Sequence, residues 1–145
     1  MKICGVEIKG NDAVICILSM DDDTFNLPDC RVRKVSIEKT ASSDQLKVFQ
    51  QTFSKLMEDY QIEKVIIRER PTKGKFAGGA IGFKLEAAIQ LGDLPVTLMS
   101  PVSVKEQNKR NPPQVDFDGL DLKKFQQNAF EVAFAFQNKC IFTKA

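Results

Sequence analysis

Three glutamates stand where their carboxylates could meet. They are Glu7 at the end of the apolar run Ile3–Val6, Glu69 at the end of the run Val65–Arg68, and Glu131 in an apolar C-terminal segment. A run of β-forming residues that stops on a carboxylate puts negative charge at the carboxyl end of a strand, where open α/β sheets build their sites. Two such strand ends, joined by a third acid from a helix, would form a divalent metal site.

The absence of histidine narrows the chemistry. None of the 145 residues is His, which excludes Ser-His-Asp and Cys-His catalysis and every His-containing zinc site. The four cysteines are scattered without a Cys-x-x-Cys pair, so they do not have the spacing of a zinc site either. Any catalysis must therefore rest on carboxylates and lysines.

Composition indicates one domain over residues 1–145 with its own core. The net charge of +2 is too small to indicate nucleic-acid binding by itself. No stretch approaches the roughly 18 apolar residues of a membrane span, and the first residues lack the layout of a signal peptide. With cysteines in apolar runs, these features predict a reduced, cytoplasmic protein without membrane contact.

The first part of the chain predicts three antiparallel strands, over Lys2–Ile8, Ala13–Leu18 and about Arg31–Ile37, because short polar links join them. A capping box formed by Ser42 and Gln45 then begins a helix with one apolar stripe.

The remaining segments alternate between strand and helix. They are a strand at Lys64–Glu69, a helix at Gly78–Leu91, a strand at Pro95–Met99, a short helix from Pro101 to about Lys109, and a last helix from Asp121 to about Asn138. This order predicts an α/β layer fold in which helices cover a mixed sheet.

Basic residues follow Glu69, and they have two interpretations. Arg70, Lys73 and Lys75, continued by Lys84, would suit a phosphate-bearing substrate beside the acids, or would simply form a solvated loop. The glycines of residues 74–82 match neither a Walker A loop nor the Rossmann pattern, so Gly78, Gly79 and Gly82 predict close packing of a helix start.

The last helix also leaves alternatives open. Glu131 and Asn128 share its polar arc, which fits a solvated face as well as a metal site. Phe130 and Phe134 form a second apolar strip, which indicates either burial on two sides or a dimer contact.

Five segments follow one another in an order typical of a known family. They are Ile3–Glu7 before a Gly-containing turn, Val65–Glu69, Ala80–Ala88, Leu98–Lys105 and Asn128–Ala133. Together they resemble RuvC-type Holliday-junction resolvases and their uncharacterised bacterial relatives, in the RNase H-like superfamily. The resemblance implies an α/β, RNase H-like, five-stranded mixed sheet flanked by helices, with three antiparallel strands and then parallel strands. The fourth strand would lie parallel beside the first, making Glu7 and Glu69 neighbours.

The same resemblance implies a metal-dependent nuclease that acts on structured nucleic acid by two-metal phosphodiester hydrolysis. Its catalytic residues would be Glu7, Glu69 and Glu131, and these with Asn128 would bind Mg²⁺ or Mn²⁺. The nucleic-acid backbone would be held by Arg70, Lys73, Lys75, Lys84 and Lys105. Resolvases of this type act as dimers, so a homodimer is also implied.

The acids depart from the family pattern. Glu7 and Glu131 stand where the family has Asp, and Asn128 stands where it has an acid. Two-metal sites need closely defined ligand positions. Whether the chain is an enzyme therefore stays open, and a catalytically silent nucleic-acid- or protein-binding module is the alternative. An actin-like ATPase shares this sheet but is a weaker hypothesis, because phosphate loops are missing.

Overall fold

The computed structural model describes residues 1–21, 24–38, 42–71, 73 and 79–143. Within these residues a six-stranded sheet has the order β3-β2-β1-β5-β6, and β4 also pairs with β2. The strands are β1 Lys2–Lys9, β2 Asp12–Asp21, β3 Thr24–Asn26, β4 Lys34–Ser36, β5 Lys64–Arg68 and β6 Val96–Met99. The first four pair antiparallel, whereas β5 is parallel to both β1 and β6.

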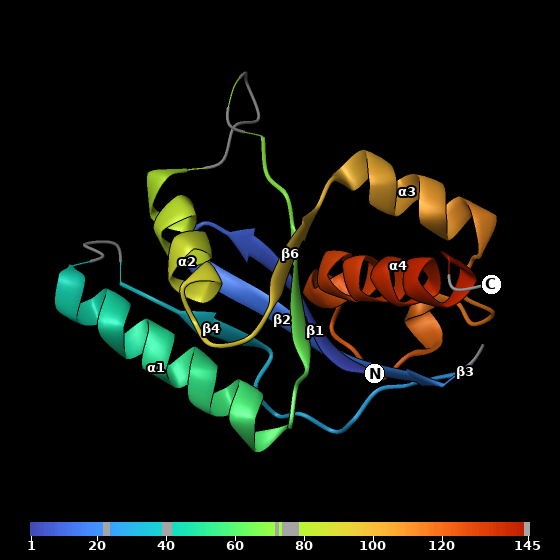
Figure 1. Ribbon diagram of the computed structural model, residues 1–145, viewed down its shortest axis with the longest axis horizontal. Coiled ribbons are helices and arrows are strands. Elements are labelled where there is room, and N and C mark those ends of the chain that lie inside the picture. The colour runs from blue at the N-terminus through green and yellow to red at the C-terminus, as the bar shows by residue number, and fades with distance from the viewer. Residues whose placement is uncertain (22–23, 39–41, 72, 74–78, 144–145) are drawn as a thin grey trace.

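Two helices cover each face of this sheet (Figure 1). They are α1 Ser43–Asp59 and α2 Ala80–Gln90 on one side, and α3 Pro101–Arg110 and α4 Gln127–Thr143 on the other. Short 3₁₀ turns, η1 Phe117–Gly119 and η2 Lys124–Gln126, lie between α3 and α4. The mixed α/β architecture predicted from the sequence is thereby confirmed.

The central strands are apolar on both faces because each face has its own core. Alternate residues such as Cys4, Val6 and Ile67 pack under α1 and α2, whereas Ile3 and Ile66 pack under α4. Phe130 and Phe134, 2% and 4% exposed, belong to the second core and lie against Phe25. Burial of α4 on two sides is therefore the correct alternative, and these rings form no dimer contact.

The prediction of five strands was wrong by one. The strand predicted at Arg31–Ile37 is limited to β4, and β3 was missed because the acidic residues at 21–23 indicated a loop. Both short strands fit because β2 is ten residues long: β4 pairs with its first residues and β3 with its last.

The last helix begins at Gln127 and not at Asp121. Gln126 closes the preceding 3₁₀ turn, since its side-chain oxygen accepts from the Lys123 N–H at 2.9 Å. Its side-chain amide donates to the Ile15 carbonyl, also at 2.9 Å, in the core. Phe125, expected in the apolar stripe, is therefore 42% exposed.

The small residues at the start of α2 only partly follow the prediction. Gly79 is the N-cap of α2, and a Cβ there would meet nothing within 4 Å. Gly82 is buried, but a Cβ there would clash with the guanidinium of Arg70. Gly78 lies outside the described residues.

Candidate functional site

A cavity of about 590 Å³ opens at the carboxyl ends of the parallel strands. It lies between the end of β5, helix α3, the α3–α4 connection and the first turns of α4. Its polar lining includes four side chains: Arg68, Lys105, Asn128 and Glu131. This is the edge of the sheet at which the sequence predicted a site.

Glu7 faces Arg68 across the parallel strands β1 and β5. The ladder ends with Val6 beside Ile67, so the next residue along each strand is Glu7 and Arg68. Arg68 Nη1 lies 3.9 Å from Glu7 Oε2, and their side chains are 29% and 13% exposed. A largely buried carboxylate is thus paired with a cation, which offsets much of its cost of desolvation.

Asn128 contacts the same carboxylate from α4. Its side-chain amide nitrogen donates a hydrogen bond to Glu7 Oε2 at 2.7 Å. Helix α4 reaches β1 because Gly5 has no side chain: a Cβ there would clash with the Ala129 carbonyl and lie 2.8 Å from Ala133 Cβ. Gly5 and the small residues of α4 therefore bring Asn128 and Glu7 together.

Glu131 lies one helical turn beyond Asn128 and is half-buried. Its Oε1 accepts from Gln127 Nε2 at 3.2 Å. Its backbone carbonyl accepts from Asn108 Nδ2 at 3.2 Å, which fixes α3 against α4. Glu131 thus shares the cavity with Asn128 and Arg68, as its predicted role requires.

Glu69 lies apart from this group. It is exposed, its N–H donates to the Met99 carbonyl at 2.9 Å, and it lines a separate cavity of about 390 Å³ beside the end of β6. Burial raises the pKa of Glu86 on α2; the charge of Arg70 opposes this and that of Glu69 adds to it. Strands β1 and β5 are neighbours as predicted. Glu7, however, is paired with Arg68, and the charge of Glu69 adds to the raised pKa of Glu86.

The side chains predicted as metal ligands do not fit a divalent metal site in this arrangement. In the part of the chain that the structure describes, no three Asp, Glu, His or Cys side chains come close enough together to hold a metal ion. Glu7 Oε2 already accepts a hydrogen bond from the Asn128 amide and lies 3.9 Å from the Arg68 guanidinium. Both groups are N–H donors, and the guanidinium would repel a metal ion bound there. The metal ligands predicted from the sequence are thus divided between two places, with a cation in one of them.

Arg70, which was predicted to hold nucleic acid, is half-buried and packs against the start of α2. Its guanidinium lies 4.4 Å from the Phe83 ring centroid and donates to the Gly79 carbonyl at 3.4 Å. Desolvation lowers its pKa, although the charge of Glu86 acts in the opposite direction. In this conformation Arg70 joins the segment after β5 to α2.

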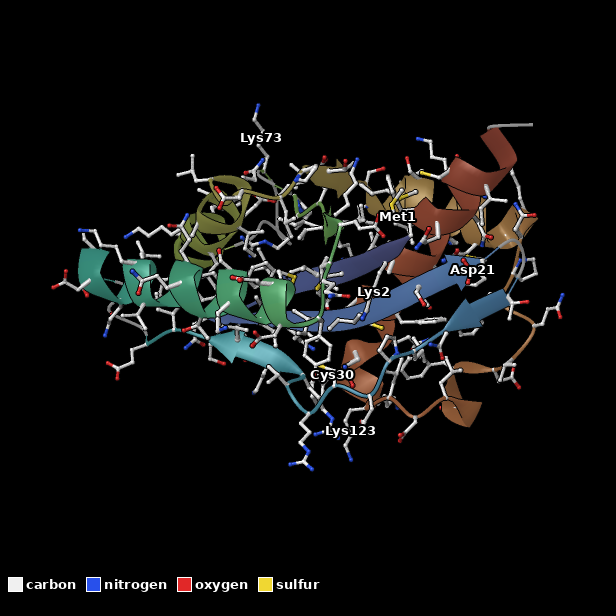
Figure 2. All side chains as sticks on the ribbon, turned by 60° about the horizontal axis from the view of Figure 1, so that its bottom comes forward. Met1, Lys2, Asp21, Cys30, Lys73 and Lys123 are labelled. Atoms are coloured by element: carbon white, nitrogen blue, oxygen red, sulfur yellow. The ribbon has the colours of Figure 1, made fainter. Side chains whose placement is uncertain are left out.

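The predicted lysines are differently placed. Figure 2 shows Lys73 projecting away from the body of the protein. Lys84 is exposed on α2, and Lys105 is exposed on α3 at the cavity. Lys75 lies outside the described residues.

Two residues of the site were missed from the sequence, Arg68 and Asn108. The sequence places Arg68 only at the end of the run Val65–Arg68, and the register of β1 with β5 is needed to place it beside Glu7. Asn108 carries no sequence signal, because its role depends on how α3 crosses α4.

A protein family described as "Protein of unknown function (DUF3010)" matches residues 1–136. The chain belongs to this family. No match was found among curated proteins. Among solved structures the chain is similar to RuvC of Thermus thermophilus, with a TM-score of 0.77 at 11% identity, covering 99% of this chain and 97% of that one.

Two structures with DNA are also similar to this chain. T. thermophilus RuvC in complex with a Holliday junction substrate has a TM-score of 0.76 at 11% identity, covering 100% of this chain and 98% of that one. The Fowlpox virus resolvase in complex with Holliday junction DNA has a TM-score of 0.56 at 16% identity, covering 97% and 99%. This DUF3010 chain therefore has a RuvC-like fold, and the fold implied by the resemblance is confirmed. Among its described helices, none is long and apolar enough to cross a membrane.

Proposed function

We propose that this chain is a RuvC-like domain that binds structured nucleic acid at the cavity edge without hydrolysing it at Glu7. One observation carries the proposal: Asn128 donates a hydrogen bond to Glu7 Oε2, and the Arg68 guanidinium lies 3.9 Å from the same oxygen. Two-metal hydrolysis needs carboxylates that are free to share two cations about 4 Å apart. A guanidinium in that place supplies one positive charge, which can contact phosphate but cannot activate water.

Basic side chains at the cavity could contact the backbone of a nucleic acid. Arg68 and Lys105 line it together with the acids Asp116 and Glu131, and Lys73 and Lys84 are exposed elsewhere. Guanidinium and ammonium groups bind phosphate oxygens well. Similarity over nearly the full length to two proteins whose structures contain Holliday junction DNA suggests branched nucleic acid as the class to test first.

A metal-dependent nuclease is the second candidate. It is favoured by Glu131, which lies one turn from Asn128 on the same cavity as Arg68. It requires Mg²⁺ or Mn²⁺ held by Glu7, Glu69 and Glu131 with Asn128, as the sequence predicted. Glu69 is the ligand that this candidate must recruit from another position.

A labelled four-way junction and a duplex of equal length test the two candidates. We expect the junction to bind in EDTA without any metal ion, with preference for it over the duplex, and no cleavage when Mg²⁺ is added. Lys105→Gln should weaken binding and reduce its salt dependence by about one counterion, whereas Lys55→Gln on the exposed face of α1 should not. Mg²⁺-dependent cleavage that Glu69→Gln abolishes would establish the second candidate.

We also place the protein in the cytoplasm. All four cysteines are described and free, and Cys4 and Cys16 are buried. Free thiols fit a reducing compartment. Localising a tagged full-length chain would test this assignment.

A further inference from the structure

The cavity beside Arg68 has a lining of mixed chemistry. Pro113, Val115 and Phe117 are among its apolar side chains, and the charged ones are Arg68, Lys105, Asp116 and Glu131. Its volume of about 590 Å³ lies within the range of small-molecule sites, roughly 300–1,000 Å³. A ligand matched to it would combine a flat apolar body with polar edges and negative charge.

Asn108 lines the cavity but offers no acceptor to a ligand. Its amide nitrogen donates to the Glu131 carbonyl, and its Oδ1 has less than 1 Å² of accessible surface. The carboxylates of Asp116 and Glu131, which also line the cavity, are acceptors that the N–H groups of a ligand can reach.

The positive charges lie on the same cavity. Arg68 is 29% exposed, so part of its guanidinium can meet a ligand while it stays beside Glu7. Lys105 is exposed on α3. Together they provide donors for a phosphate within reach of the same space.

We infer that this cavity takes a single nucleotide turned out of a nucleic-acid strand. The base would lie against Pro113, Val115 and Phe117 and donate an N–H to Asp116 or Glu131, while Arg68 and Lys105 hold its phosphate. A base can enter only where it is unpaired, so the cavity would select bulges, mismatches or junction centres. This inference rests on the proposed function and names the feature of the nucleic acid that is recognised.

Three duplexes of equal length test the inference: fully paired, with a bulged 2-aminopurine nucleotide, and with an abasic bulge. We expect the bulged probe to bind with a change in 2-aminopurine fluorescence. The paired and abasic probes should bind about tenfold more weakly, the value of one stacked base. Equal affinity for the bulged and abasic probes would overturn the inference.

A cavity-filling variant gives the matched comparison. Val115→Trp should reduce affinity for the bulged probe to that for the paired duplex and leave affinity for the paired duplex unchanged. Val102→Trp, exposed on α3 outside the cavity, should change neither. A bulge preference that survives Val115→Trp would place recognition elsewhere and overturn the inference.

A titration with free AMP, followed by backbone amide chemical shifts, distinguishes a site for free nucleotides from a site for a nucleotide within a strand. We expect weak AMP binding at the cavity that Val115→Trp removes. AMP binding as tight as that of the bulged probe would mean that the site takes free nucleotides, which would overturn selection of a strand. If no nucleic-acid probe binds, the proposed function fails. The AMP titration would then show separately whether the cavity binds a nucleotide.

Discussion

Arg68 and Glu7 stand side by side at the ends of two parallel strands, where the charge of one residue sets what the other can bind. At 3.9 Å, in surroundings of effective dielectric about 20, opposite unit charges attract by about 4 kcal/mol before desolvation is counted. The same Arg68 charge acts against a divalent cation on Glu7. At this sheet edge, a guanidinium therefore stands beside the largely buried carboxylate.

Glu86 gives a residue-scale test through pH. Burial leads the causes that raise its pKa above the usual 4.5, so folding favours its neutral form. A raised folded-state pKa contributes stability that is full below the unfolded-state value and is lost as pH rises through the folded value. Glu86→Gln should therefore be more stable than wild type at about pH 7 and lose that advantage near about pH 4.

Urea unfolding at the two pH values measures this difference. Glu106→Gln is the control, because that side chain is exposed on α3. A Glu86→Gln variant less stable than wild type at pH 7 would mean that attraction to Arg70 outweighs desolvation.

At the scale of elements, the docking of α4 on β1 builds the site. Gly5 permits the contact, so Gly5→Ala should destabilise the protein by about 1–3 kcal/mol, as overpacking does, although Ala is otherwise the better strand residue. The free energy of unfolding in urea measures the change, and loss of the Asn128–Glu7 contact should weaken junction binding too.

Gly79→Ala is the matched control, since a Cβ there would meet nothing within 4 Å. Its stability should change by less than about 1 kcal/mol. Gly5→Ala with wild-type stability would show that α4 does not approach β1 as closely as described.

The elements also show what sequence could predict. The apolar runs predicted that Lys2–Ile8 and Lys64–Glu69 are strands, because runs buried on both faces belong in the centre of a sheet. The resemblance to RuvC-type resolvases implied that these strands lie parallel side by side. It could not predict their register, which the crossover through α1 sets. A shift of one residue along β5 separates a Glu7–Glu69 pair from the observed Glu7–Arg68 pair.

The start of α4 was missed for a similar reason. Helical spacing continues back to Leu122, but α4 begins only at Gln127. The residue before it, Gln126, instead donates a long-range hydrogen bond to the Ile15 carbonyl. Such contacts, between residues far apart in sequence, have no signature in local periodicity. Asn128 and Glu131 could be predicted as site residues, since both lie within the regular part of α4.

At the scale of the whole molecule, the fold agrees with RuvC over nearly its full length at 11% identity. A fold can be kept while the chemistry of its site changes, because packing depends on apolar pattern and activity depends on a few side chains. In this member of the DUF3010 family the overall fold is RuvC-like, while among the described residues no three acidic, His or Cys side chains gather as a metal site would require.

The most direct measurement is a Mn²⁺ titration of isotope-labelled protein, followed by paramagnetic broadening of backbone amides. The Glu7–Arg68–Asn128 arrangement predicts no localised broadening in wild type. It also predicts that Arg68→Glu, which places a second carboxylate beside Glu7, gains broadening around Gly5–Ile8 and Asn128–Val132. Broadening of both segments together with Arg68–Arg70 in wild type, lost in Glu69→Gln, would contradict the account and establish a metal site.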